Sequence, residues 1–248
     1  MKETMAILSL IVSILALSLG LYNQFQLEKN KARTDQLAFD KRVREIYDSI
    51  GGDENTPNIV SMWRNRDRET QTKVKHLLDE LDTAHDEHEH IYLLKSYYAA
   101  MKGNYDEQSS HLGKALKLNP RFTSAHVALG SFYFYQQENE KAIASYKKAL
   151  TLEPDTWVAY LGLGNIHYKM GDYQEALKNY RASSDIEKDA PEPLIGVSNS
   201  FERLGYYACA KKYCQEAHEL NRTYALAKQC MTDLSVYKQK LCQEPNLE

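Results

Sequence analysis

Apolar residues recur with a helical spacing along most of this chain. Between residues 89 and 224 they form runs of about 14 residues whose apolar positions lie three or four apart. Short turn segments such as Gly171-Asp172-Tyr173 separate these runs. The spacing places the apolar side chains on one face of an α-helix, and each turn joins two neighbouring antiparallel helices. The pattern therefore predicts an all-α fold built from pairs of helices.

The helical pairs repeat with a period of 34 residues. The segment AHVALG that begins at Ala125 aligns with AYLGLG that begins at Ala159, and Tyr146 aligns in the same way with Tyr180. A single pair of short helices cannot bury its apolar face, whereas stacked pairs bury it between neighbours. We therefore expect an extended array that is closed at its ends by capping segments.

This period and its key positions resemble the tetratricopeptide repeat, in which Leu-Gly comes early, a small residue stands near position 20, an aromatic residue follows four positions later and Pro ends the unit. The resemblance implies an α-solenoid of about four repeats, at residues 89–122, 123–156, 157–190 and 191–224, with a cap helix and tail at 225–248. The small residues are expected to let the helices of a pair approach closely. The matching residues are Leu129, Gly130, Tyr133, Ala142, Tyr146, Ala149 and Pro154, then Leu163, Gly164, Ala176 and Tyr180.

Residues 1–22 contain a long uncharged segment. From Met5 to Tyr22 there are 18 residues without a charge, enough for a helix of ~27 Å. This predicts an N-terminal transmembrane helix, and the alternative is a signal peptide that is cleaved near Ala16-Leu17-Ser18. Basic residues follow the segment, so the positive-inside rule predicts a single-pass membrane protein whose repeats lie on the cytoplasmic side. The basic residues are Lys29, Lys31, Arg33, Lys41, Arg42 and Arg44.

Residues 23–50 continue as a predicted juxtamembrane helix. A stripe of mostly apolar residues, with spacings of three and four, runs along this segment. Such a stripe can form a homodimer with a second copy, or it can pack back against the repeats, and the sequence leaves both alternatives open. The stripe comprises Tyr22, Phe25, Lys29, Ala32, Gln36, Phe39, Val43, Ile46 and Ile50.

Residues 51–88 are expected to form a linker followed by a packing helix. Gly51 to Pro57 has the composition of a turn, and the helix after it carries Val74, Leu77, Leu78 and Leu81 on one face.

The run from Asp79 to His90 contains six carboxylates and three histidines. We expect it to be a solvated segment that binds no metal. A divalent-metal site is the alternative, because His85 lies one helical turn from both His88 and Glu89.

The remaining composition excludes several functional classes. A net charge of -3 and the lack of a basic stripe argue against nucleic-acid binding. There is no phosphate-binding Gly-rich loop, HExxH or GxSxG motif, so neither catalysis nor a cofactor is expected. The four cysteines are expected to be small apolar residues in the terminal helices, with a Cys214–Cys230 disulfide or a zinc site as alternatives. They are Cys209, Cys214, Cys230 and Cys242.

The resemblance implies a peptide-binding groove on the first helix of each repeat. Asn165 and Asn199 occupy equivalent positions, and their amides can hold the backbone of an extended peptide. A clamp for a terminal carboxylate is not expected, because Leu93, Val127 and Leu161 stand where such clamps have Lys or Arg. The predicted function is therefore a membrane-tethered scaffold that binds partner proteins, and the alternatives are a secreted or periplasmic repeat protein and a metal-binding protein. The groove residues are Leu93, Tyr97, Val127, Ser131, Phe134, Tyr135, Leu161, Asn165, Tyr168, Lys169, Ile195, Asn199, Glu202 and Arg203.

Overall fold

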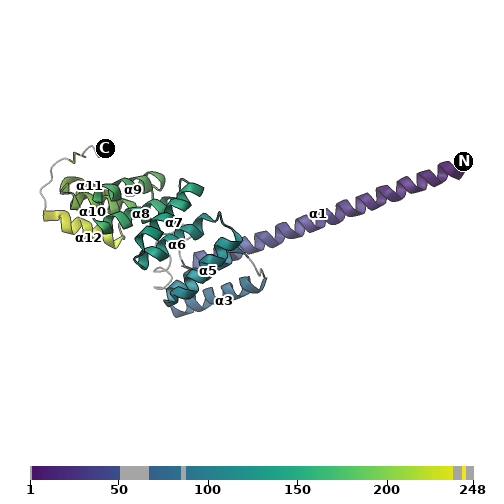
Figure 1. Cartoon of the computed structure of the whole chain (residues 1–248), viewed down its shortest axis with the longest axis horizontal. Helices are drawn as coiled ribbons and strands as arrows, with labels where there is room; N and C mark the ends of the chain where they lie inside the picture. Colours follow the sequence, from purple (N-terminus) through teal and green to yellow (C-terminus); the bar gives the residue numbers. More distant parts are fainter. Residues whose placement is uncertain (1, 51–66, 85–87, 237–241, 244–248) are drawn as a thin grey trace.

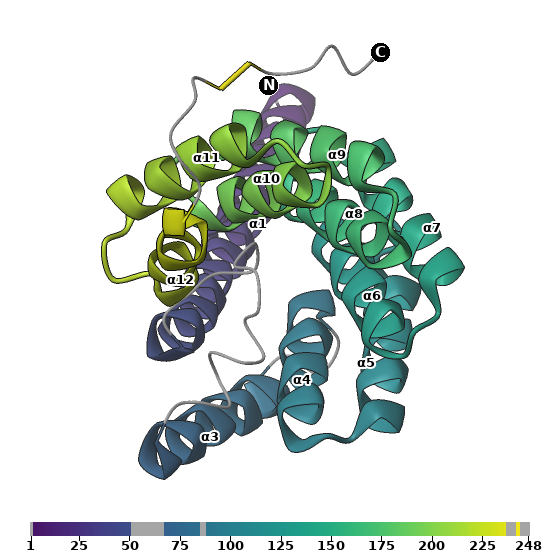
Figure 2. The ribbon, with the colours of Figure 1, turned by 90° about the vertical axis from the view of Figure 1, so that its left-hand side faces the viewer.

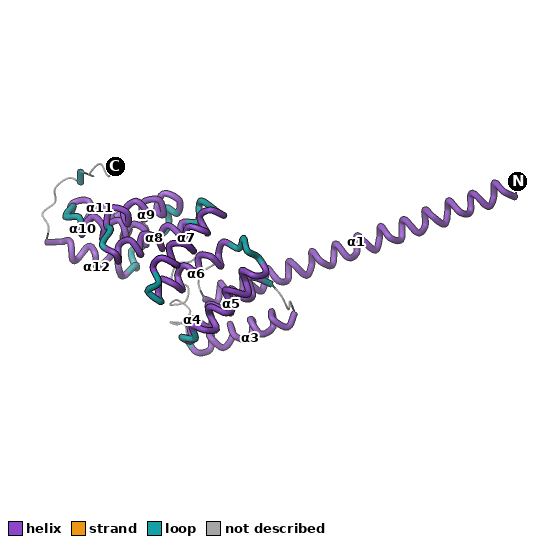
Figure 3. The backbone as a smooth tube through the Cα atoms, in the orientation of Figure 1, coloured by secondary structure: helices purple, strands orange, loops and turns teal. Residues whose placement is uncertain are grey.

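The chain is seen in a computed structural model that describes residues 2–50, 67–84, 88–236 and 242–243, with side chains from Leu21 onward except at residues 50 and 84. This described part consists of eleven α-helices and one short 3-10 helix and contains no strand (Figure 3). The all-α prediction is confirmed.

Each predicted 34-residue unit contains one antiparallel helical pair, and the loop within each pair is short. The first helix of each pair lies on the inside of a curved array and the second helix lies on its outside (Figure 2). The pairs are α4 (Glu89–Lys102) with α5 (Tyr105–Leu118), α6 (Thr123–Tyr135) with α7 (Asn139–Leu152), α8 (Trp157–Met170) with α9 (Tyr173–Ile186), and α10 (Pro191–Arg203) with α11 (Tyr207–Leu220).

A residue with left-handed backbone conformation follows the first helix of each pair. Gly103, Gly171 and Gly205 have φ of 76°, 89° and 85° there, a region in which glycine has no steric cost. In the second pair Gln137 adopts φ of 63° instead. The turn after α6 is therefore the one that carries backbone strain among the four.

Two buried tyrosines hold consecutive units together. A Cβ atom added to Gly130 would lie 2.7 Å from the ring of Tyr146, and one added to Gly162 of the next unit would lie 2.3 Å from it. Tyr180 stands in the same relation to Gly164, at 2.6 Å, and to Gly196, at 2.5 Å. The expected close approach at Gly130 and Gly164 is confirmed.

The sequence did not identify Gly162 and Gly196 as partners of these rings. Each ring enters the space between two glycines, one in its own unit and one in the following unit, so it joins the units as well as the helices of a pair.

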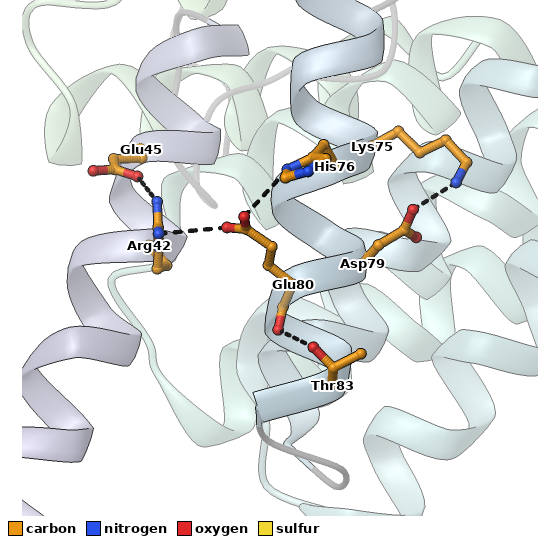
Figure 4. Close-up of polar contacts among 7 residues, drawn as sticks. All are labelled: Arg42, Glu45, Lys75, His76, Asp79, Glu80 and Thr83. Atoms are coloured by element: carbon orange, nitrogen blue, oxygen red, sulfur yellow. Dashed lines mark hydrogen bonds and ion pairs between the residues drawn. The ribbon is translucent and has the colours of Figure 1, made fainter.

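The long helix α1 (Lys2–Ile50) extends away from the array, and only its last third packs against the rest of the chain (Figure 1). Phe39, Ile46 and Tyr47 are buried there, in one core with apolar residues of α3 (Arg68–Ala84). The Arg42 guanidinium lies 3.4 Å from the Glu80 carboxylate on α3 (Figure 4).

The stripe of α1 thus packs back against the chain from residue 39 onward. Tyr22 and Phe25, by contrast, are exposed. The α3 residues that the sequence placed on one face, Val74, Leu77, Leu78 and Leu81, are all buried.

No helix in the described part of the chain is both long enough and apolar enough to cross a lipid bilayer. The predicted anchor at residues 1–22 falls mostly on residues whose side chains lie outside the described part.

The C-terminal end of the array is cross-linked. Helix α12 (Ala225–Asp233) and a 3-10 turn (Leu234–Val236) cover the fourth unit. Cys214 of α11 is bonded to Cys230 of α12, and Cys209 is bonded to Cys242, with Cα atoms 5.9 Å and 4.5 Å apart.

This corrects the expectation that the cysteines are unpaired apolar residues. All four cysteines of the sequence are paired, and the Cys209–Cys242 bond was not foreseen. The Cys214–Cys230 alternative is the one that the structure contains.

Candidate peptide-binding face

The structure places five of the fourteen predicted groove residues in the core. All five belong to the hydrophobic core clusters and are no more than 7% exposed: Leu93, Tyr97, Val127, Leu161 and Ile195. These five side chains therefore offer little surface to a bound partner and contribute mainly to the stability of the scaffold.

The other nine predicted residues are at least partly exposed and come from the second, third and fourth units. They occupy the last two turns of α6, α8 and α10, on the helices that line the inside of the array (Figure 2). This face comprises Ser131, Phe134, Tyr135, Asn165, Tyr168, Lys169, Asn199, Glu202 and Arg203.

Asn165 is exposed, and a buried tyrosine orients it. The Tyr180 hydroxyl donates a hydrogen bond of 2.7 Å to Asn165 Oδ1. Burial raises the pKa of Tyr180, so the hydroxyl keeps its proton for this bond. Because the amide oxygen is engaged, the Asn165 Nδ2 group is the part that can donate to a ligand carbonyl.

The same arrangement recurs one unit earlier. The hydroxyl groups of Ser131 and Tyr146 lie 3.0 Å apart, and burial raises the pKa of Tyr146 to about 12. In the second and third units the ninth position is therefore tied to the tyrosine of the second helix, with serine in one unit and asparagine in the other.

Asn199 differs from Asn165 although the sequence makes them equivalent. The fourth unit has Cys214 where Tyr180 stands in the third, and that sulfur is bonded to Cys230. The phenol that orients Asn165 therefore has no counterpart at this position of the fourth unit. The two asparagines thus differ in the residue that stands at the equivalent position of the second helix, Tyr180 in one unit and Cys214 in the other.

Aromatic rings and cations link the neighbouring units along this face. Lys169 Nζ lies 5.3 Å from the centroid of the Phe134 ring, which lies 5.8 Å from the ring of Tyr135. A cation over an aromatic ring is attracted by the ring's negative face. Units two and three therefore present one continuous surface at these residues.

A second cluster joins the third and fourth units. Arg203 donates to the Tyr173 hydroxyl at 3.0 Å from Nε and 2.7 Å from Nη2. The Tyr173 ring lies 5.4 Å from that of Tyr168. The hydrogen bond to Tyr173 raises the pKa of Arg203, and burial raises the pKa of Tyr168.

Sequence reasoning missed Tyr173 because it belongs to the second helix. Tyr173 comes directly after the Gly171-Asp172 turn. A residue at that position returns toward the end of α8, and this could have identified Tyr173 as part of the face. Together these contacts give the face amide and cationic donors, apolar rings and one carboxylate.

The outside of the array has a hollow of about 610 Å³ between α9 and α11. Sequence reasoning did not predict it. Its lining is of mixed charge and includes Arg181, Lys188, Tyr213, Glu216 and Glu219.

Three residues of the acidic, His-rich run come together at the start of α4. Ligand atoms of His88, Glu89 and His90 all lie within 4.8 Å of one another. His85, the residue on which the metal alternative was based, lies outside the described residues.

The comparisons with known families concern the middle of the array. Residues 130–171 match the family described as TPR repeat, and residues 157–190 match the family described as Tetratricopeptide repeat. The curated proteins contain no match to this chain.

Solved structures share the fold at low identity. Pseudomonas aeruginosa pilF has a TM-score of 0.64 at 14% identity, over 82% of this chain and 85% of that one. TTC0263, a thermophilic TPR protein of Thermus thermophilus, has a TM-score of 0.59 at 14% identity, over 68% of this chain and 92% of that one. A chain of the APC/C hetero-tetramer Cut9-Hcn1 has a TM-score of 0.62 at 18% identity over 71% of this chain, which spans only 35% of its length.

These likenesses concern the fold alone, and the family matches cover the two central units. The segment from Gly130 to Ala190 therefore consists of tetratricopeptide repeats, set in a longer array of helical pairs with the same architecture.

Proposed function

We propose that this chain is a membrane-tethered scaffold that holds an extended peptide of a partner protein on the inner face of its repeats. The oriented Asn165 amide carries the proposal. A partner's backbone carbonyl accepts from Asn165 Nδ2, while the rings of Phe134, Tyr135 and Tyr168 contact its side chains. The face carries two basic residues and one acidic residue, so it favours a peptide with both acidic and basic side chains. These residues are Lys169, Arg203 and Glu202.

The test compares partner capture by the parent protein and by variants of this face. Asn165→Ala combined with Asn199→Ala removes two donors to the peptide backbone, and each unmet hydrogen bond costs ~1 to 3 kcal/mol. Affinity is therefore expected to fall at least about tenfold, since ~1.4 kcal/mol corresponds to one decade. Phe134→Ala with Tyr135→Ala is expected to weaken binding as much, because aromatic anchors dominate many interfaces.

Tyr180→Phe refines this test because it leaves the exposed face unchanged. It frees the Asn165 amide to rotate and is expected to weaken capture, whereas Tyr146→Phe, which frees Ser131 in the same way, is expected to change capture less. The control for nonspecific effects is Lys147→Ser with Lys148→Ser, two exposed positions on α7. Loss of capture in this control, with capture retained by the asparagine pair, would place the partner outside the inner face.

The uncharged segment from Met5 to Tyr22 supports membrane tethering. The basic residues that follow it favour repeats on the cytoplasmic side.

The cysteines support a second candidate, in which the repeats lie outside the cytosol, either anchored or released after signal cleavage. Disulfides persist in oxidising compartments and are rare in the cytosol, and all four cysteines of this chain are paired.

Thiol trapping in intact cells separates the two candidates. Cells are quenched in acid, and the thiols are alkylated before and after reduction. An oxidising location predicts no alkylated cysteine before reduction and four afterwards. A cytosolic location predicts four alkylated cysteines without reduction, and that result would eliminate the second candidate.

A further inference from the structure

The start of α4 gathers three metal-ligating side chains from consecutive residues. One ligand atom each from His88, Glu89 and His90 lies within 4.8 Å of the other two. Four-coordinate zinc, with bonds of about 2.1 Å, needs its ligand atoms about 3.4 Å apart. The three ligand atoms therefore have to move closer together before they can bind one ion.

The two imidazole rings are held by aromatic neighbours. The His88 ring is stacked on Phe39 of α1, with centroids 4.1 Å apart, and the His90 ring lies 4.6 Å from that of Phe122, the residue before α6. The rings of His88 and His90 are 5.2 Å apart. Packing of this kind restricts ring rotation, which lowers the entropy lost when a ligand is bound.

The carboxylate of Glu89 is positioned as well. Asn119 Nδ2 donates to Glu89 Oε1 at 3.1 Å, and Glu89 Oε2 lies 3.5 Å from His88 Nδ1. Partners that hold a ligand in this way usually increase metal affinity. The side chains of His88 and Glu89 are only 26% and 24% exposed, so the group is partly shielded from water.

Charge favours a cation at this point. The Glu89 carboxylate lies beside two imidazole rings, a donor set that suits a divalent cation. His88 Nδ1 accepts from the His90 backbone N–H at 3.3 Å, so an ion bound by His88 replaces that hydrogen bond.

We propose that His88, Glu89 and His90 bind a divalent transition-metal ion of the zinc class where α1, α4 and the start of α6 meet. Imidazole nitrogen with carboxylate oxygen suits zinc, cobalt, nickel and copper, whereas magnesium and calcium prefer all-oxygen sites. Three protein ligands leave at least one coordination position for water or for a group from another molecule. This site is separate from the peptide-binding face and does not depend on it.

The position of the site gives it a structural consequence. His88 is the N-terminal cap of α4, and its ring packs on Phe39, which belongs to the buried end of α1. An ion that fixes both imidazoles also fixes their contacts with α1 and with the start of α6. Metal binding therefore stabilises the junction between the long helix and the array.

The test uses untagged full-length protein titrated with Zn²⁺ and, separately, with Co²⁺. Zinc in excess is expected to raise the melting temperature by roughly 5 °C, because an ion that binds only the folded state stabilises it by mass action. Co²⁺ is expected to show the visible absorption of a four-coordinate complex. Glu89→Gln keeps the size of the side chain and the oxygen that accepts from Asn119, but it removes the charge. It is expected to weaken the affinity for the metal ion at least about tenfold. His90→Ala is expected to abolish the cobalt spectrum.

His76→Ala is the matched control. His76 Nδ1 lies 3.3 Å from Glu80 on α3, a histidine–carboxylate pair that forms no three-ligand group among the described residues, and its side chain is 73% exposed (Figure 4). This variant is expected to retain the metal response. An equal response in the parent and in His90→Ala, or no response in the parent, would overturn the proposal, and neither result would bear on peptide capture by the inner face.

Discussion

At the scale of single residues, Tyr146 and Tyr180 each combine two roles. The ring fills the space between two glycines, and the hydroxyl reaches the inner face, where it contacts Ser131 or Asn165. A buried core side chain thus sets the orientation of an exposed polar one. Packing between units and the polar pattern of the inner face are thereby linked through the same two residues.

Substitution of the glycines tests this packing. Gly164→Leu forces a side chain into the Tyr180 ring and is expected to destabilise the fold by ~1 to 3 kcal/mol, the usual cost of overpacking. Lys178→Leu on the exposed side of α9 is expected to be nearly neutral in the same urea or thermal unfolding experiment. Equal losses in these two variants would refute the assigned register.

Gly113→Ala tests a helical glycine that, unlike Gly164, has space for a side chain. Gly113 lies in α5, and a Cβ there has no neighbour within 4 Å. Alanine should therefore stabilise the helix by roughly 0.5 to 1 kcal/mol.

Alkaline pH tests the burial of Tyr146. Its folded-state pKa of about 12 exceeds the ordinary value of 10.0, so the folded state retains the proton that the unfolded state loses. The associated stability is complete below about pH 10 and is lost as pH rises toward 12, by roughly 2 kcal/mol at about pH 11.5.

Tyr146→Phe removes this ionisable group and serves as the comparison. It is expected to be about 1 kcal/mol less stable than the parent at neutral pH, because the Ser131 hydrogen bond is lost. At about pH 11.5 the difference should vanish or reverse. Parallel stability curves for the two proteins between pH 9 and about 11.5 would contradict the assigned burial.

At the scale of elements, α1 divides into two parts with different surroundings. Its C-terminal part contributes Phe39, Ile46 and Tyr47 to the core, whereas the segment around Tyr22 and Phe25 is exposed. A truncation that removes the whole helix therefore removes core side chains along with the predicted anchor.

Two truncations separate these contributions. Protein that begins at Asn23 is expected to leave the membrane fraction under carbonate or high salt and to remain folded. Protein that begins at Asp53 is expected to melt lower, because each buried apolar side chain contributes roughly 2 kcal/mol.

Full-length protein is expected to resist the same extraction. Intact mass that shows a mature N-terminus near residues 19–21 would replace the anchor by a signal peptide. Persistent membrane binding of the protein that begins at Asn23 would place the membrane contact elsewhere.

The cap helix shows how one element takes over the contact of another. Two units earlier, Tyr146 and Gly162 occupy the positions equivalent to Cys214 and Cys230. The disulfide therefore stands where the tyrosine ring meets glycine. Ser198 Oγ, in the position of Gly130 and Gly164, lies 2.9 Å from the Cys214 sulfur. A covalent bond therefore replaces ring packing at this junction, and α12 stands where the first helix of a following unit would stand.

At the scale of the whole molecule, periodic features were predictable and aperiodic contacts were not. The 34-residue period determines which helices form and how they stack, because every unit buries its apolar face against its neighbours in the same way. The candidate inner-face residues near the ends of α6, α8 and α10 came from the resemblance to the tetratricopeptide repeat. The burial of Leu161 and Ile195 did not, since the position within a repeat does not specify how far a side chain is covered by its neighbour.

Contacts between distant segments were also beyond the sequence pattern. The packing of Phe39 against His88 joins α1 to the residue before α4, two segments that have no common period, and the Cys209–Cys242 bond joins α11 to the tail. Such contacts depend on where the array ends and how the chain returns to it. Only the arrangement in space contains that information.

The tyrosine–glycine contact makes the length of the array adjustable. A second copy of residues 157–190 inserted after residue 190 would present Gly162 to the preceding Tyr180, and its own Tyr180 to Gly196. The junction between the two copies would be new, but it would have a tyrosine ring facing a glycine, as the two existing junctions have. A duplicated 191–224 would instead place Cys214 opposite Gly196 and leave both without their present neighbours. Duplication of the third unit therefore preserves the tyrosine–glycine contact at every new junction, whereas duplication of the fourth unit does not.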